Sequence, residues 1–295
     1  MREAVQCNEP MQHIQETGPL LRTAQEAIGA PQPMTFEPAR ANFRGRYGRN
    51  LAATLRRCER RQEWYRDYLL EEGMDPIAFV GGGTVGGNVA GAARIIRFVL
   101  ARSSHAFHGP VARGDLFDAI VEMAESAGIL VMVDEPVSRD VPAHLAAELD
   151  IDFLGLTLVD DLAPVIFING ALDMQDRLHC LLRHMALLWL GISGVGGKAS
   201  GSESPCPVAL WCDEVASAAI DPLTRLAHER ALVLESPPEA DACMRATTRA
   251  SRRFSRAVVN HTMSSKTRFT DAFRLLDIPS SDMFMAIRHS FETRT

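Results

Sequence analysis

The sequence predicts an α+β fold, in which a small sheet with a β-hairpin packs on helices and a helical subdomain follows at the C-terminal end. Three observations predict it. Two short apolar and β-branched runs, at 154–159 and 164–170, are joined by a polar turn, which is typical of a hairpin. An amphipathic stretch at 176–191 follows directly and ends at a glycine, as helices commonly do. Residues 236–295 again have the pattern of helices.

The composition is that of an ordinary globular protein of one or two domains. Of the 295 residues, 46% are hydrophobic and 23% are charged, and the formal net charge is −6. A negative net charge argues against direct nucleic-acid binding, because affinity for phosphate needs clustered positive charge. No run is apolar enough to span a membrane and the first residues lack a signal-peptide core, so we expect a cytoplasmic protein without a membrane partner. The six widely spaced cysteines are expected to be reduced thiols.

The N-terminal part divides into an arm and a first helix. Residues 1–45 contain five prolines and little periodicity, which predicts an arm that wraps the body or stays mobile. The main domain is predicted at 46–235 and begins with a helix at 47–72, which Gly73 ends. Its arginines are interleaved with acidic residues, so its charged face is expected to be solvated.

A glycine-rich stretch follows this helix. Gly81, Gly83 and Gly86 satisfy the pattern G-x-G-x-x-G of dinucleotide-binding loops. That fold also needs a full buried strand before the glycines and an acidic residue about 20 positions further on. Only a short apolar run precedes them, and residues 102–108 contain no acid. The glycines are therefore interpreted as a flexible loop that leads into a helix at 88–102.

The elements before and after the hairpin complete the domain. A helix is predicted at 115–128, with Asp115 as its N-cap, and a buried strand at 129–133. Residues 135–153 are acidic and predict a loop, as do the small residues at 196–207. A helix is expected to open after that loop, within residues 209–220. The C-terminal subdomain carries a predicted helical stripe of arginines, expected to face solvent or a partner: Arg245, Arg249, Arg252, Arg253 and Arg256.

Three stretches of the main domain together resemble one known family. They read VDDLAPVIFING at 159–170, LLWLGISGV at 187–195 and WCDEVASAAIDP at 211–222. They are similar to the ImmA/IrrE family of zinc metallopeptidases, which cleave helix-turn-helix repressors in phage-immunity and stress switches. The resemblance extends over roughly residues 46–292 and implies a zincin-like sheet and hairpin.

The chain departs from this family where the chemistry should be. The family's central helix carries HEXXH, in which two histidines bind zinc and the glutamate is the general base. The resemblance places this motif on Arg183, His184, Met185, Ala186 and Leu187. It places the third zinc ligand, a glutamate of the next helix, on Ala218. His184 therefore stands at the position of the base, both zinc histidines are replaced, and no cofactor is expected.

A displaced zinc site is the alternative. Cys180 and His184 are four residues apart and share one face of the predicted helix, and Glu214 lies one turn before Ala218 on the next. Cysteine, histidine and glutamate side chains are all zinc ligands. In this register Leu181 stands where the base would be, so such a metal would be structural more than hydrolytic.

Two functions follow from the resemblance. The first is a catalytically degenerate protein that binds or regulates a helix-turn-helix repressor or another protein without cleaving it. Its partner groove would be lined by Arg183, His184, Asp160 and Asn169. The second is an active zinc metallo-endopeptidase that cleaves such a repressor. A decayed reading frame that keeps its fold without a selected role is a third possibility.

Overall fold

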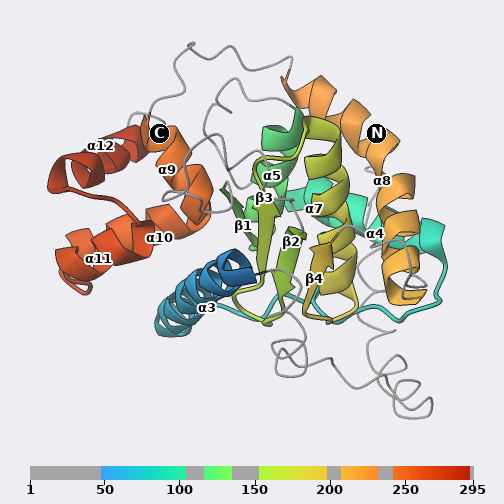
Figure 1. Ribbon diagram of the computed structural model, residues 1–295, viewed down its shortest axis with the longest axis horizontal. Coiled ribbons are helices and arrows are strands. Elements are labelled where there is room, and N and C mark those ends of the chain that lie inside the picture. The colour runs from blue at the N-terminus through green and yellow to red at the C-terminus, as the bar shows by residue number, and fades with distance from the viewer. Residues whose placement is uncertain (1–47, 104–115, 135–152, 198–206, 232–241, 293–295) are drawn as a thin grey trace, which may run out of the picture. The chain divides into compact units, whose positions relative to one another are not determined.

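The computed structural model describes residues 48–103, 116–134, 153–197, 207–231 and 242–292 (Figure 1). The α+β class is confirmed, since the described residues form nine helices and one four-stranded sheet. The predicted N-terminal arm lies outside the described residues, as do Asp115 and nearly all of the loop predicted at 135–153. None of the described helices has the length and apolar character that crossing a membrane requires.

The sheet is mixed and has the strand order β1-β3-β2-β4. Its strands are β1 (Leu130–Asp134), β2 (Phe153–Leu158), β3 (Val165–Asn169) and β4 (Gly194–Gly197). The predicted hairpin is confirmed, because β2 and β3 are antiparallel neighbours, whereas β1 runs parallel to β3. Strand β4 pairs antiparallel with β2, although the sequence predicted a loop for its last two residues. Three of its four residues are glycine, which has low strand propensity, so pairing with β2 accounts for the strand better than local preference.

Helices cover both faces of the sheet (Figure 1). Side chains on alternate strand positions belong to two separate cores: Val131 and Ile166 to one, Met132 and Phe167 to the other. The first core contains α4 (Val89–Ser103), α5 (Leu116–Ser126), α7 (Met174–Trp189) and α8 (Pro207–Ala231). The second contains α3 (Gly48–Glu71), α9 (Ala242–Ala250), α10 (Arg252–Met263), α11 (Phe269–Leu276) and α12 (Ser281–Glu292).

Most helix ends agree with the sequence. Gly73, Gly128 and Gly191 follow α3, α5 and α7 with φ of +66°, +96° and +68°, the left-handed conformation expected after a helix. Helix α8 is longer than predicted, since it continues through Pro222 to Ala231. The proline removes one backbone donor without ending the helix.

The predicted arginine helix is broken at Ser251, where φ is +73°. The break starts α10, and the carboxylate of Glu125 from α5 accepts the backbone N–H groups of Arg252 and Arg253 at 2.9 and 3.2 Å. The Arg253 side chain donates to the hydroxyl of Tyr65 on α3 at 2.7 Å. Arg253, which was expected to face solvent or a partner, therefore connects the C-terminal helices to α3.

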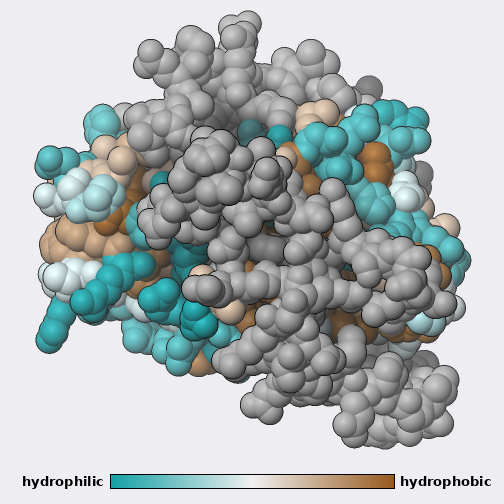
Figure 2. All heavy atoms as spheres, viewed as in Figure 1, coloured by the Kyte–Doolittle hydropathy of each residue, from teal (hydrophilic) through white to brown (hydrophobic). Residues whose placement is uncertain are grey.

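Hydrophobic side chains also reach the surface of the C-terminal helices (Figure 2). Met263, Phe269 and Met285 are 42%, 47% and 47% exposed. They come from the end of α10, the start of α11 and the middle of α12.

Candidate functional site

Helix α7 lies on the sheet and turns Cys180 and His184 toward it. Asp173 caps its start by accepting the N–H of Asp176 at 2.8 Å, so the helix begins slightly before the predicted stretch. Its buried face includes Cys180 and His184, which are 4% and 0% exposed. This face packs on β2 and β3, and α8 packs against the same helix.

His184 is a neutral buried imidazole with one hydrogen-bond partner in the part of the chain that the structure describes. Its Nδ1 lies 2.6 Å from the hydroxyl oxygen of Thr157 on β2. Burial, and secondarily the positive charge of Arg183, lowers the pKa of His184 from 6.5 to about 3. The other ring nitrogen, Nε2, is buried and has no hydrogen-bond partner among the described residues. A side chain so enclosed has no exposed surface with which to act as a general base on a peptide.

Two glycines on neighbouring strands face the ring of His184. Gly155 on β2 pairs with Gly196 on β4. A Cβ added to Gly155 would lie 2.8 Å from Nε2 of His184, 2.9 Å from Sγ of Cys180 and 2.6 Å from the carbonyl oxygen of Phe167. A Cβ on Gly196 would lie 3.1 Å from the same Nε2. A side chain at Gly155 would force the helix or the sheet to move, and one at Gly196 would press on the ring of His184.

The three positions on which the resemblance would place zinc ligands have different surroundings. Arg183 forms an ion pair with Asp213 of α8, with 3.1 Å between Nε and Oδ1. Leu187 is buried in the core that α7 shares with α8. Ala218 is exposed on α8. Arginine, leucine and alanine side chains are not zinc ligands.

The displaced zinc set is only partly brought together. Cys180 and His184 lie side by side, as their four-residue spacing predicts, but Glu214 is exposed on α8. In the part of the chain that the structure describes, no three histidine, cysteine, aspartate or glutamate side chains are grouped to hold a metal. Burial raises the pKa of the Cys180 thiol to about 12, which keeps it protonated at neutral pH.

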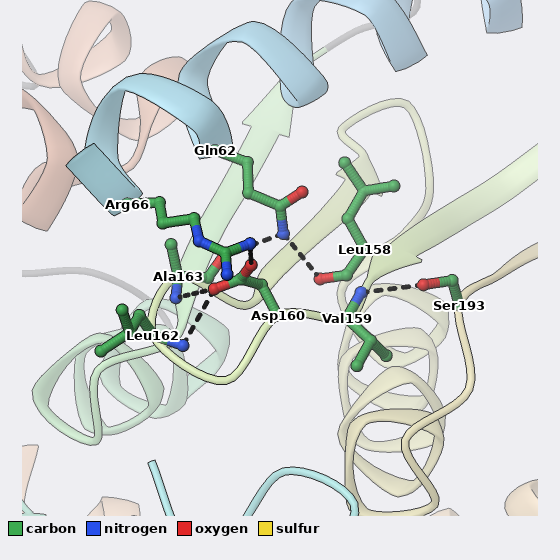
Figure 3. Close-up of polar contacts among 8 residues, drawn as sticks. All are labelled: Gln62, Arg66, Leu158, Val159, Asp160, Leu162, Ala163 and Ser193. Atoms are coloured by element: carbon green, nitrogen blue, oxygen red, sulfur yellow. Dashed lines mark hydrogen bonds and ion pairs between the residues drawn. The ribbon is translucent and has the colours of Figure 1, made fainter. Parts of the chain in front are cut away.

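Asp160 and Asn169, expected in a partner groove, stabilise turns. Asp160 follows β2 and accepts the N–H groups of Leu162 and Ala163 at 2.9 and 2.8 Å, while its second oxygen pairs with Arg66 of α3 (Figure 3). Asn169 is buried, and its side-chain oxygen accepts the N–H of Ala171 at 3.0 Å. With His184 buried as well, Arg183 is the most exposed of the four expected groove residues.

The hairpin turn is also held from two further directions. Gln62 of α3 donates to the carbonyl oxygens of Leu158 and Ala163 at 3.1 and 2.9 Å (Figure 3). The hydroxyl of Ser193, just before β4, accepts the N–H of Val159 at 2.9 Å. The turn is therefore fixed between α3 and the segment that follows α7.

The glycine-rich stretch covers the end of α7. Gly81 and Gly83 donate their N–H groups to the carbonyls of Leu188 and Trp189 at 3.0 and 2.8 Å. A Cβ on Gly83 would lie 2.0 Å from Nε1 of Trp189. These backbone donors are occupied by the last carbonyls of the helix and are not free to bind phosphate.

The sequence-based prediction missed the partners that surround His184. Thr157 was available as a signal, because it is the single polar residue in the strand LGLTLV, and a polar side chain in a buried strand needs a partner. Asp213 could not be assigned, because charged residues are common at helix surfaces. Cys58, Cys180, Cys212 and Cys243 are buried and form no disulfide, in agreement with the reduced thiols expected from the cysteine spacing, whereas Cys7 and Cys206 lie outside the described residues.

Comparison with known proteins gives one partial match. A family model described as a domain of unknown function (DUF8813) matches residues 250–287. The matched stretch includes α10, α11 and about half of α12, and none of the residues around His184. No curated protein and no solved structure matches the chain.

Proposed function

We propose that this protein is a non-hydrolytic relative of the ImmA/IrrE metallopeptidases that binds a helix-turn-helix repressor, or another protein, without cleaving it. The order of elements supports the proposal: a helix, a strand, a hairpin, the central helix α7 and then α8. The observation that carries it is the ion pair between Arg183 and Asp213.

This ion pair stands where the resemblance places the metal. A hydrolytic zinc site needs three protein ligands and an open position for water. On this chain those ligand positions hold Arg183, Leu187 and Ala218, and a guanidinium repels a divalent cation. Arg183 and Asp213 join α7 to α8 directly, which is the connection that a shared metal would provide in a peptidase. The scaffold is thereby held together without an ion.

The edge of the sheet offers a surface for a protein partner. Strand β4 is the last strand of the described sheet, next to β2 only. An edge strand presents backbone N–H and C=O groups that can pair with a strand of another protein. Gly194 and Val195 are partly exposed, and the pair of Arg183 and Asp213 is 17% and 40% exposed. A partner that binds along β4 could contact this ion pair.

The test is association without cleavage. The full-length protein is mixed with a helix-turn-helix repressor encoded beside its gene, and binding is measured by calorimetry and repressor integrity by mass spectrometry, with and without a chelator. We expect binding, an intact repressor and no effect of the chelator. Chelator-sensitive cleavage would contradict the proposal, and so would a failure to bind any such repressor or another protein from the same operon.

Exchanging the charges of Arg183 and Asp213 tests whether the partner binds at this ion pair. Arg183→Asp breaks the ion pair, whereas Arg183→Asp combined with Asp213→Arg restores it in reverse. We expect the exchanged variant to recover the thermal stability lost in the single variant, because the two helices are joined again. Partner binding should remain weak in both, because the charges that face the partner are changed. Wild-type affinity in the exchanged variant would place the binding surface elsewhere.

A further inference from the structure

We propose that a surface of the C-terminal helices binds a second copy of this chain, so that the protein forms a two-fold symmetric dimer. The surface is formed by Met263, Phe269 and Met285, from the end of α10, the start of α11 and the middle of α12. We call this surface the α12 patch. It contains no residue of β4 or α7, so the proposal is independent of the repressor-binding function.

The three side chains lie along one side of α12. Met263 meets α12 at Arg288, with 3.8 Å between its Sδ and the Nη1 of the guanidinium. The ring of Phe269 packs on that of Phe284, one helical turn before Arg288, with 5.3 Å between the ring centres. Met285 follows Phe284 directly and lies three residues before Arg288, so it belongs to the same part of α12. The three apolar side chains therefore form one continuous patch.

This patch is open to solvent. Each of its three long apolar side chains keeps between 42% and 47% of its surface exposed, and hydrophobic atoms are seen over the C-terminal helices in Figure 2. Single exposed apolar residues are common on monomeric proteins, whereas contiguous ones mark interaction sites. Burial of the patch against another apolar surface removes it from water, which favours association.

The charges of these helices determine which partner fits. Three basic residues are paired with carboxylates of the same chain: Lys266 with Glu72, Arg274 with Asp271 and Arg288 with Glu292. Nucleic acid binds through positive charge that the protein itself does not neutralise, so these helices are poorly suited to it. The apolar patch between compensated charges fits a protein surface instead.

Two charges beside the patch have no ion-pair partner among the described residues, and they have opposite signs. Arg268 directly precedes Phe269 at the start of α11, and Asp282 lies three residues before Met285 on the same face of α12. Both side chains are exposed. In a two-fold symmetric interface, a contact between two different residues forms twice. A second copy of this chain therefore supplies an aspartate for Arg268 and an arginine for Asp282 at the same time.

The first experiment is sedimentation velocity of the full-length protein at increasing concentration. We expect a monomer–dimer equilibrium with a dissociation constant in the micromolar range, because a small patch suits a transient interface. Met285→Lys should weaken the dimer about tenfold or more, because it places a charge in the apolar contact. Met174→Lys is the matched control: Met174 is 38% exposed at the start of α7, outside the patch, and its replacement should leave the dimer unchanged.

The second experiment reverses one charge at a time. Arg268→Asp and Asp282→Arg each place like charges opposite one another, so neither variant should dimerise at concentrations where the wild type does. A mixture of the two variants should form a heterodimer, because opposite charges then meet at both contacts. The variant that carries both changes should dimerise like the wild type. Thermal unfolding of every variant shows which of them fold.

Three outcomes would overturn the proposal. The first is a wild-type protein that stays monomeric over the whole concentration range. The second is a dimer that folded Met285→Lys does not weaken, which would place the interface elsewhere. The third is a mixture of folded Arg268→Asp and Asp282→Arg that stays monomeric, which would show that these two residues do not meet across the interface. None of these outcomes decides whether the protein binds a repressor, which the calorimetry tests separately.

Discussion

At the scale of single residues, the core around α7 depends on one side-chain hydrogen bond. His184 is completely enclosed, and of the described residues only Thr157 forms a hydrogen bond with it. A polar group in a protein interior is tolerated when it is hydrogen-bonded and strongly destabilising when it is not. Thr157 therefore determines how well a histidine can be accommodated between the helix and the sheet.

Thr157→Val should destabilise the protein. Valine has nearly the shape of threonine but cannot pair with Nδ1, so both ring nitrogens of His184 would be buried without a hydrogen-bond partner among the described residues. We expect a loss of about 1–3 kcal/mol in the free energy of unfolding, measured by urea denaturation. Thr157→Ser keeps the hydroxyl and should lose less. A loss in Thr157→Ser with none in Thr157→Val would show that the methyl group, not the hydrogen bond, is what matters.

The buried imidazole should also make stability depend on pH. In the unfolded chain His184 takes up a proton near its ordinary pKa of 6.5, whereas burial lowers the pKa in the folded protein to about 3. The unfolded state therefore binds more protons between these values, and stability falls as the pH falls through this range. From pH 7 to pH 5 we expect His184 to remove about 2 kcal/mol.

The contribution of His184 to the pH dependence of stability is measured by comparing the wild type with a variant that lacks the histidine. Urea denaturation of the wild type and of His184→Gln at both pH values isolates it, because the other ionisable groups are common to both proteins. Glu125 is one of them: burial raises its pKa, so it acts in the opposite direction, favouring the folded state as the pH falls. The same pH dependence in both proteins would show that His184 is not the residue responsible.

At the scale of elements, the end of α7 is built around Trp189. The indole ring packs on Phe79, and the glycine-rich stretch crosses it closely enough to exclude any side chain. The N–H groups of that stretch pair with the last carbonyls of the helix. The glycines thus serve to close a helix against a tryptophan.

Gly83→Ala should therefore be destabilising. The new Cβ would lie 2.0 Å from Nε1 of Trp189, so the ring or the loop must move. We expect a loss of about 1–3 kcal/mol, the usual range for overpacking, measured by thermal or urea unfolding. Gly194→Ala is the matched control, because its Cβ would meet no atom within 4 Å. An equally large loss of stability in Gly194→Ala would show that replacing a glycine, and not contact with Trp189, is the cause.

Local sequence patterns could predict the elements whose packing partners are close to them in the sequence. The hairpin and α7 follow from alternating and helical periodicity, and Gly191 marks the helix end. Strand β4 could not be predicted, because its glycines have no strand preference and only pairing with β2 orders them. The ion pair of Asp160 could not be predicted for a similar reason, because its partner Arg66 lies 94 residues away in the sequence, on α3.

At the scale of the whole molecule, the described sheet has no solvent-facing side. Alternate residues of β1 and β3 point into two cores, and α3 with α9–α12 completes the second one. Arg61 of α3 is buried in the second core and connects α3 to the C-terminal helices. It is 2% exposed and donates to the carbonyl oxygens of Leu275 and Arg249, at 2.9 Å each. The C-terminal helices therefore share their core with the sheet.

Removal of residues 236–295 should consequently prevent normal folding. Leu130, Met132 and Phe167, which are buried against the second helical layer, would be exposed, and Arg61 would lose both carbonyl partners inside the protein. We expect the truncated chain to bind the dye ANS and to unfold without a cooperative transition, as states without fixed packing do. A chain cut after residue 292 is the control and should behave like the wild type. If the truncated protein unfolds cooperatively with a native near-UV spectrum, the C-terminal helices are an independent subdomain, and the second core is not needed to hold the first together.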